Sequence, residues 1–312
     1  MDKPFATIEE QVELLRKRGL VTDEATCSTL KREGYYQVVN GYKDLFLDED
    51  MTRQTGEDRY ASGASFADLR ALFDFDRELR NTLFRYFSKA EALLKTVCSY
   101  HFAKANQGNA EAYLERSSYR KNPSYDVRIG YLLDTFKRIL HKRPYNRRRG
   151  FQREYIRHYV EKHDTTPIWV LMHFLTLGQA FQFYDFQNDK IRNEIAQAFS
   201  GLYAESHPTP KSIGTRRLRL AFDHIKDFRN ICAHDERLFC ARVSQAKDTD
   251  FTRMIADLEL VTTSDDFKAL TKEVHALLCD LSCSLGDETT ARVAKAMGLP
   301  QDFALFPMWE TA

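Results

Sequence analysis

Apolar residues recur every three or four positions along most of the chain, which is the spacing of an amphipathic α-helix. Near the N-terminus, Ile8, Val12 and Leu15 keep this spacing. They follow Thr7 and Glu10, whose separation of three residues is typical of a capping box at the start of a helix. We therefore predict that a first helix begins directly after Thr7.

The longest predicted helix begins near Ser65 and continues past Cys98. No proline or glycine interrupts this segment, and either residue would weaken or end a helix. The apolar positions that stay in helical phase are Phe66, Leu69, Phe73, Leu79, Leu83, Phe87, Ala90, Leu94 and Val97. The polar turn at residues 106–109 is predicted to end the helix.

Further helices are predicted in the later parts of the chain from the same spacing. They cover residues 127–140, the segment after Pro167, and residues 189–199, 216–233 and 265–284. A short run with the alternating pattern of a strand occurs at residues 258–261. Because this run is so short, a β-sheet core is not expected, and the predicted fold class is all-α.

Composition limits the kinds of protein that this chain can be. Its 312 residues, 43% hydrophobic and 12% aromatic, are enough for a large core. The net charge of +1 excludes a uniformly basic coat, so any surface for RNA must be local. No apolar run approaches the roughly 20 residues that span a bilayer, and the N-terminus lacks a hydrophobic signal region. We therefore expect a cytoplasmic protein without a membrane segment.

The six cysteines contain no Cys-x-x-Cys pair. Cys279 and Cys283 are one helical turn apart, but no matching pair of histidines accompanies them. We interpret the cysteines as buried thiols rather than as zinc ligands. Neither a metal site nor a cofactor is expected.

The strongest chemical signal lies in residues 229–237, which read Arg-Asn-Ile-Cys-Ala-His-Asp-Glu-Arg. Arg229 can neutralise a phosphate through two parallel hydrogen bonds, and Arg237 supplies a second cation. His234 can transfer protons near neutral pH, and Asn230 can orient either partner without carrying charge. This combination suits attack on a phosphodiester without a metal ion. We call residues 229–237 the motif segment.

The alternative interpretation of the motif segment is structural. Arg229 would then pair at the surface with Asp227 or Glu236, as surface arginines often do. His234 would be an exposed histidine that stabilises the C-terminal end of a helix through its charge.

The spacing within the motif segment raises a geometric problem. On a straight helix, Arg229 and His234 lie about 140° apart around the axis, too far to converge on one phosphate. Either the helix unwinds near Ala233, or two copies of the segment face each other. Asn230, His234 and Arg237, by contrast, are predicted to share one helix face by their three- and four-residue spacing, and to form one half of a cleft between two such copies.

A second functional signal is the basic stretch from residue 116 to residue 162, with 14 lysines and arginines against 4 aspartates and glutamates. Interleaved tyrosines, including Tyr119 and Tyr131, could stack on unpaired bases. The alternative is a solvated face whose tyrosines pack in the core. The candidate nucleic-acid contacts are Arg143, Arg147, Arg148, Arg149 and Arg153, a second basic group at Lys211, Arg216 and Arg217, and the paired tyrosines Tyr35 and Tyr36.

Residues 229–234 resemble the Arg-x4-His motif of HEPN ribonucleases. The form Arg-Asn-x-x-Ala-His is the one carried by Abi-type abortive-infection proteins of bacteria, the AbiD/AbiF-like group. Three more segments resemble that family's pattern in the expected order: the tyrosine-rich segment 30–42, residues 72–80 with 90–95 ("FD-x-x-LR … E-x-x-L-K"), and residues 167–169 with 175–178 ("P-x-W … L-T-x-G"). The basic run at residues 147–149 is not part of the pattern.

The resemblance implies an all-α, HEPN-type helical bundle with additional N-terminal and inserted helices. It also implies a homodimer, because HEPN proteins commonly bring two copies of the motif together and this chain has one. The expected domains are an N-terminal helical segment at 1–60, a HEPN-like domain at 61–285 with the basic insert 116–162, and a C-terminal tail at 286–312 that packs on the same domain.

The implied activity is that of a metal-independent endoribonuclease that leaves a 2′,3′-cyclic phosphate and a 5′-hydroxyl. His234 would act as general base or acid, Arg229 and Arg237 would stabilise the charged phosphorane, and Asn230 would orient the histidine or the phosphate. Glu91 would reach from the long helix to hold Arg229 or His234, the alternative being a solvated carboxylate.

The resemblance implies partners as well. The protein would act as an abortive-infection or toxin effector in phage defence, and a noncoding RNA would bind or restrain it. Two alternatives stay open: a noncatalytic RNA-binding HEPN scaffold, or a toxin whose basic patch meets an acidic protein antitoxin.

Overall fold

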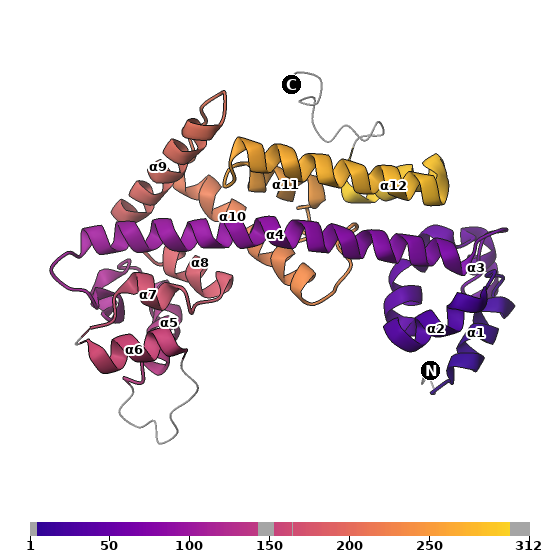
Figure 1. Cartoon of the computed structure of the whole chain (residues 1–312), viewed down its shortest axis with the longest axis horizontal. Coiled ribbons are helices and arrows are strands. Elements are labelled where there is room, and N and C mark those ends of the chain that lie inside the picture. The colour runs from indigo at the N-terminus through magenta and orange to yellow at the C-terminus, as the bar shows by residue number, and fades with distance from the viewer. Residues whose placement is uncertain (1–4, 143–152, 164, 300–312) are drawn as a thin grey trace. The chain divides into compact units, whose positions relative to one another are not determined.

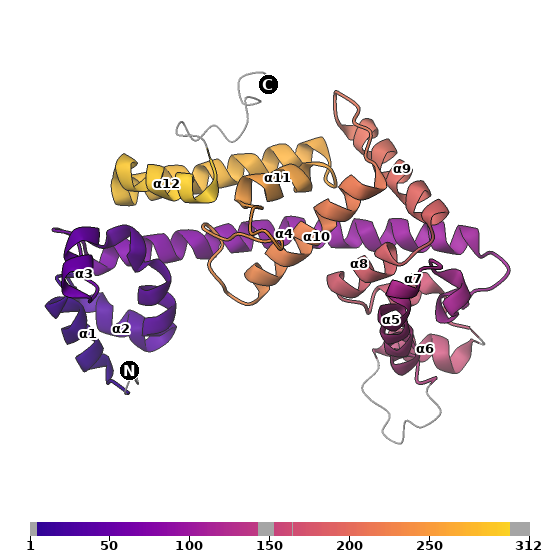
Figure 2. The same ribbon diagram turned by 180° about the vertical axis from the view of Figure 1, so that it is seen from behind.

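The computed structural model describes residues 5–142, 153–163 and 165–299 of the chain. Helices make up most of this part, which contains isolated β-bridges but no β-strand. The all-α fold class predicted from the apolar spacing is therefore confirmed. Figures 1 and 2 show the helices from opposite sides.

The α-helices of the described residues are joined by segments of different lengths, several of which contain 3₁₀ turns. They are α1 (Ile8–Lys17), α2 (Glu24–Glu33), α3 (Glu49–Thr55), α4 (Phe66–Ala105), α5 (Asp126–Ile139), α6 (Glu154–Lys162), α7 (Ile168–Met172), α8 (Leu177–Asp185), α9 (Asp189–Ser206), α10 (Thr215–Ala233), α11 (Phe251–Glu259) and α12 (Ser264–Met297).

The chain divides into two compact units, each built from separated segments. The first unit consists of Met1–Phe84, Ile231–Thr252 and Ala269–Ala312, and the second of Arg85–Asn230 and Arg253–Lys268. Helices α4, α10, α11 and α12 each contribute residues to both units. The domain boundaries expected after residues 60 and 285 stay a prediction.

Helix α1 begins as its sequence predicts. The backbone N–H of Glu10 donates to the Thr7 hydroxyl at 3.2 Å, and the backbone N–H of Thr7 donates to the Glu10 carboxylate at 2.7 Å. This reciprocal pair is a capping box, which satisfies two of the N–H groups that a helix start leaves unpaired. Val12 and Leu15 are buried on the inner face of the helix.

Helix α4 is a continuous helix of 40 residues, drawn as an unbroken ribbon in Figure 1. All nine apolar positions predicted to share its inner face are buried, from Phe66 at the start to Val97 near the end. The helix ends at Ala105, directly before the polar turn that was predicted to stop it. The predicted long helix is therefore confirmed.

Aromatic side chains form much of the core of the second unit. The ring centroid of Phe183 lies 5.1 Å from that of Phe102 and 6.1 Å from that of Tyr119. Tyr119 is 1% exposed, and its hydroxyl donates to the backbone oxygen of Tyr113 at 2.6 Å. The prediction that Tyr119 offers a stacking surface to RNA is wrong, because this ring gains more from burial among other aromatic rings. Tyr131, in contrast, is 71% exposed.

The C-terminal region corrects one expectation and extends another. The strand-like run at residues 258–261 forms the end of α11 and the turn after it, since four residues are too few to set a strand period. The helix predicted at 265–284 is present within α12, which continues to Met297. A kink at Gly286 interrupts it, with a φ of 77° that glycine adopts without a Cβ clash.

The cysteines are free thiols with different environments. Cys98 is buried as predicted, and burial raises the pKa of its thiol. The prediction of buried thiols is wrong for Cys279 and Cys283, which are exposed on α12. Among the described residues, no three His, Cys, Asp or Glu side chains are grouped as metal ligands would be. No helix in that part of the chain is both long and apolar enough to cross a membrane.

Candidate active site at the end of helix α10

Helix α10 carries the first part of the motif segment. Its buried face consists of Leu218, Ala221, Phe222, Ile225 and Phe228, among others, at the three- and four-residue spacing of a helix. The helix was predicted over residues 216–233, and the structure confirms this within one residue.

The helix ends inside the motif segment. Ala233 is its last residue, and His234 and Asp235 form the turn that follows. The backbone N–H of Glu236 donates to the backbone oxygen of Ile231 at 3.0 Å, which is the hydrogen bond of a Schellman motif. Asp235 occupies the left-handed position of that motif with a φ of 56°, where glycine is the usual residue.

The helix end agrees with one of the two geometries left open by the sequence, unwinding near Ala233, and the facing of two copies stays a prediction. Because the helix ends after Ala233, His234 lies beyond it. The angle of about 140° calculated for a straight helix therefore does not apply to Arg229 and His234. The prediction that Asn230, His234 and Arg237 share a helix face is wrong for the same reason, since His234 and Arg237 lie beyond the last helical turn.

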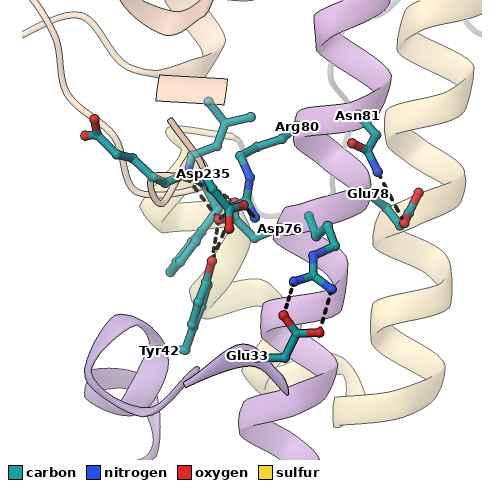
Figure 3. Close-up of polar contacts among 11 residues, drawn as sticks. Glu33, Tyr42, Asp76, Glu78, Arg80, Asn81 and Asp235 are labelled. Atoms are coloured by element: carbon teal, nitrogen blue, oxygen red, sulfur yellow. Dashed lines mark hydrogen bonds and ion pairs between the residues drawn. The ribbon is translucent and has the colours of Figure 1, made fainter. Parts of the chain in front are cut away.

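The side chain of Asp235 is held by an arginine of α4. Its Oδ1 accepts a hydrogen bond from Nη2 of Arg80 at 2.5 Å (Figure 3). Nη1 of Arg80 donates to Asp76 at 2.7 Å and to the backbone oxygen of Glu236 at 3.3 Å. The guanidinium is 4% exposed, so it binds both the side chain and the backbone of the turn from inside the unit. These contacts offset the strain of a left-handed aspartate.

Asp76 is the buried centre of this arrangement, with none of its side chain exposed. Besides Arg80, it accepts hydrogen bonds from the backbone N–H groups of Leu238 at 3.0 Å and Phe239 at 2.8 Å, and from the hydroxyl of Tyr42 at 2.8 Å. Burial raises the pKa of Asp76, while Arg80 and these donors favour its charged form. The carboxylate of Asp76 thereby fixes the backbone at Leu238 and Phe239, directly after the motif segment.

Tyr42 is packed as well as hydrogen-bonded. Its ring makes an edge contact with Phe73 at 5.5 Å and stacks on Phe239 at 6.0 Å, both measured between ring centroids. Burial raises the pKa of the Tyr42 hydroxyl, and the negative charge of Asp76 adds to that shift. We call Tyr42, Asp76, Arg80 and Asp235 the Asp76 network.

The Asp76 network joins segments that are far apart in the sequence. Tyr42 ends the tyrosine-rich segment, Asp76 and Arg80 are the Asp and Arg of the "FD-x-x-LR" pattern, and Asp235 belongs to the motif segment. Sequence reasoning noted these patterns but assigned the four residues no role. The sequence did contain a signal for Asp76 and Arg80, because an aspartate and an arginine four residues apart interrupt the apolar face of a long helix. Charged side chains are rarely buried unless they are paired, so this spacing indicates a buried ion pair.

Arg237 ties the motif segment to the same tyrosine-rich segment. Its Nη1 donates to the backbone oxygen of Gly41 at 2.8 Å and lies 3.8 Å from Oδ2 of Asp44. The side chain stays 43% exposed. Arg237 is thus oriented by a backbone carbonyl next to Tyr42 while part of its guanidinium faces solvent.

Arg229 lies in the last turns of α10, in the second unit. Its Nη2 is 3.8 Å from Oε2 of Glu91 on α4, and the other carboxylate oxygen of Glu91 is 2.7 Å from Nζ of Lys95. The prediction that Glu91 reaches the motif segment from the long helix is therefore confirmed for Arg229. The catalytic role of Glu91 stays a prediction.

The remaining predicted catalytic side chains are at the surface. Asn230 and His234 are both exposed. The boundary between the two units falls between Asn230 and Ile231, so Arg229 and Asn230 belong to the second unit and His234 and Arg237 to the first.

The candidate nucleic-acid contacts are distributed unevenly. Arg143, Arg147, Arg148 and Arg149 lie outside the described residues. Arg153 is exposed directly before α6. Tyr36 is 76% exposed, at the start of a π-helical turn, Tyr36–Asn40. Its neighbour Tyr35 is half-buried, and this burial raises the pKa of its hydroxyl.

Two members of the second basic group are bound to carboxylates of α11. Arg217 forms an ion pair with Asp257, whose side chain is fully buried. Lys211 donates to Glu259 at 2.8 Å, and this bond raises the pKa of the lysine against the opposing effect of burial. Arg216 is exposed. Of these three cations, Arg216 is therefore the most accessible to a nucleic acid.

Comparison with known protein families gives one match. A family model described as Abi-like protein matches residues 28–240, which is more than half of the chain. The matched range includes Tyr42, Asp76, Arg80 and the whole motif segment. Comparisons with curated proteins and with solved structures gave no match.

Proposed function

Because the chain belongs to the family of Abi-like proteins, we propose that it is a metal-independent endoribonuclease of the HEPN type. In this proposal it acts as an abortive-infection effector in phage defence, and the motif segment carries the catalytic groups. A HEPN-type helical bundle is the fold that this proposal assigns to the all-α chain.

The observation that carries the proposal is the environment of His234. This imidazole is exposed directly after the last residue of α10, and the next residue, in a left-handed conformation, is bound through its side chain by the buried Arg80. An exposed titratable side chain on a backbone fixed by several hydrogen bonds is the arrangement that acid–base catalysis requires. A histidine that only capped a helix would not need such support.

The proposed reaction is attack of a ribose 2′-oxygen on the adjacent phosphorus, with breakage of the bond from phosphorus to the 5′-oxygen. His234 takes the proton of the 2′-hydroxyl or returns a proton to the 5′-oxygen. Arg229 and Arg237 stabilise the charge that develops on the phosphorane, and Asn230 orients the phosphate. The products are a 2′,3′-cyclic phosphate and a 5′-hydroxyl. DNA lacks the 2′-hydroxyl and would not be cleaved.

Glu91 is a positioning residue in this proposal. Its carboxylate, shared between Arg229 and Lys95, holds the guanidinium of Arg229 by charge. We also propose a homodimer, which would supply two copies of the motif segment, and a noncoding RNA as the restraining partner. Both extend the proposed activity beyond a single chain.

His234→Ala tests the proposal. Loss of a general acid or base typically lowers the rate about 100- to 10,000-fold, so RNA cleavage and host toxicity should both disappear. EDTA should leave the wild-type rate unchanged. His173→Ala removes another exposed histidine, directly after α7, and should cleave like the wild type. Equal cleavage by the two variants would refute the assignment of His234 and favour a noncatalytic scaffold.

A further inference from the structure

Two large aromatic side chains of the second unit are exposed although their neighbours are buried. Tyr100 on α4 is 63% exposed, and Trp169 on α7 is 52% exposed. Ile168 and Val170, on either side of Trp169, are 1% and 8% exposed. Trp169 is therefore exposed although the residues on either side of it are packed in the core. Aromatic rings left in water forgo the stabilisation of burial, and grouped exposed rings often mark a binding site.

Tyr100 and Trp169 line the same pocket. It has a volume of about 420 Å³, within the range of small-ligand sites. Phe102 and Ile168 contribute buried apolar side chains to its lining. Such a lining offers flat apolar surfaces to a planar ligand.

The polar residues of this pocket are carboxamides and a lysine. Asn106, Gln107, Asn109 and Lys104 line it together with the aromatic rings, and none of its described lining residues is acidic. The amide of Asn106 donates to the backbone oxygen of Phe102 at 2.8 Å, which orients its side chain. Carboxamides can hydrogen-bond the edge of a base, and a lysine can neutralise a phosphate.

A second, polar pocket adjoins the first. The two share Lys104, Asn106 and Asn109, and the second has a volume of about 530 Å³. It adds Lys190 and several hydroxyl and amide side chains. It also contains two glutamates, of which Glu115 accepts a hydrogen bond from Asn109 at 2.7 Å. An aromatic pocket beside a polar one matches a nucleotide, whose base is flat and apolar on its faces and whose ribose and phosphate are polar.

We propose that the pocket between Tyr100 and Trp169 binds an unpaired base of a single-stranded RNA segment. The base stacks on one or both rings, the carboxamides contact its edge, and Lys104 contacts the neighbouring phosphate. This site deepens the proposed function, on which its assignment to RNA rests, by giving the second unit an RNA-binding site that does not include residues of the motif segment. Binding there needs no cleavage.

Tryptophan fluorescence gives a direct test. The chain has two tryptophans, so Trp309→Phe leaves Trp169 as the single reporter. In this background, with His234→Ala added to prevent cleavage, oligouridylate should quench the fluorescence with a saturable dependence on concentration. Stacking of a base on an indole is the expected cause of the quenching. Absence of quenching by oligouridylate and by oligoadenylate would overturn the proposal.

Variants then identify the rings and the phosphate contact. Binding of a labelled oligonucleotide, followed by anisotropy, should weaken about 5- to 150-fold in Tyr100→Ala or Trp169→Ala, as expected for a lost stack. Tyr100→Phe keeps the ring and should bind normally. Lys104→Ala should reduce the salt dependence of binding by about 0.7 in slope. Phe5→Ala removes another exposed ring that does not line the pocket, and affinity should be unchanged.

Three outcomes would contradict the proposal. Equal losses in Phe5→Ala and Tyr100→Ala would show general stacking rather than a pocket. Dissociation of a homodimer by Trp169→Ala, without a change in oligonucleotide affinity, would show that a second copy covers the rings. Equal binding of oligothymidylate would support a base pocket but overturn its assignment to RNA. None of these outcomes depends on whether the wild-type protein cleaves RNA. The proposal of this binding site and the proposal of the activity can therefore be refuted independently of each other.

Discussion

The two ends of the motif segment are held by different kinds of interaction. At the arginine end, Arg229 is 28% exposed and makes a 3.8 Å ion pair with Glu91, which Lys95 shares. At the histidine end, the turn is bound by Arg80, which is 4% exposed, and by the fully buried Asp76. One end is held by partly solvated charges and the other by a buried network.

This difference implies different physical roles for the two ends. Partly solvated ion pairs contribute little to stability, typically about 0 to 1 kcal/mol, and can rearrange when a phosphate approaches. Removing one partner of a buried pair costs about 3 to 5 kcal/mol, because the other charge is left uncompensated. The backbone next to His234 is therefore held more firmly than the ion pair of Arg229 with Glu91, which can rearrange around a substrate.

The largest effect is expected for Asp76→Ala. It leaves Arg80 without its buried partner and removes the acceptor of two backbone N–H groups, so the free energy of unfolding should fall by about 3 to 5 kcal/mol. Urea denaturation measures this loss. Asp74→Ala is the matched control, because the Asp74 side chain is 49% exposed in its pair with Arg70. Similar midpoints for the two variants would mean that the network does not fix the turn.

A smaller effect separates the backbone strain at Asp235 from its ion pair. Both Asp235→Ala and Asp235→Gly remove the bond to Arg80, but glycine adopts the φ of 56° without a Cβ clash. The alanine variant should therefore be less stable than the glycine variant by about 1 to 2 kcal/mol in urea. If the two variants unfold together, the left-handed conformation is not retained after the side chain is lost.

At the arginine end, Glu91→Gln should lower the free energy of unfolding by less than Asp76→Ala does, since the Glu91 side chain stays 17% exposed and glutamine keeps its shape. If Glu91 positions Arg229, RNA cleavage should nevertheless fall, with a larger change in kcat than in KM. Glu78→Gln, at an exposed position of the same helix, is the control. Cleavage that matches this control would restrict Glu91 to a structural role.

The smallest effect concerns Glu33, which accepts two hydrogen bonds from Arg77 (Figure 3). The bonds to Arg77 lower the pKa of Glu33 below its usual value of 4.5. A lowered carboxyl pKa stabilises the folded state above the unfolded pKa, and this contribution is lost as the pH falls through the folded pKa. The wild type should therefore exceed Glu33→Gln slightly in stability at pH 7 and lose that advantage below about pH 4. Denaturation of both proteins at several pH values measures the difference, and a constant difference would contradict the assignment.

The helices and the position of the motif segment could be predicted from the chain alone. Local patterns of this kind depend on neighbours within a few residues and can be recognised from the sequence. They include the capping box at Thr7, the apolar face of α4 and the extent of α10. The resemblance to Abi-type proteins likewise depends on short local motifs. The contact of Glu91 with Arg229 joins two helices far apart in the sequence, so no local period predicts it, and a solvated carboxylate was the open alternative.

Tertiary structure alone decided how the end of the motif segment is held. Tyr42 and Asp76 are separated by 34 residues and Arg80 and Asp235 by 155, so no local period relates them. Whether a tyrosine such as Tyr119 stacks on RNA or fills the core also depends on which distant rings surround it. Sequence by itself determined which segments are helical, because helix formation is governed by near neighbours, and it named residues 229–237 as candidates for chemistry. Only the folded chain decided which charges are buried and which backbone turn they hold, because burial depends on contacts between residues far apart in sequence.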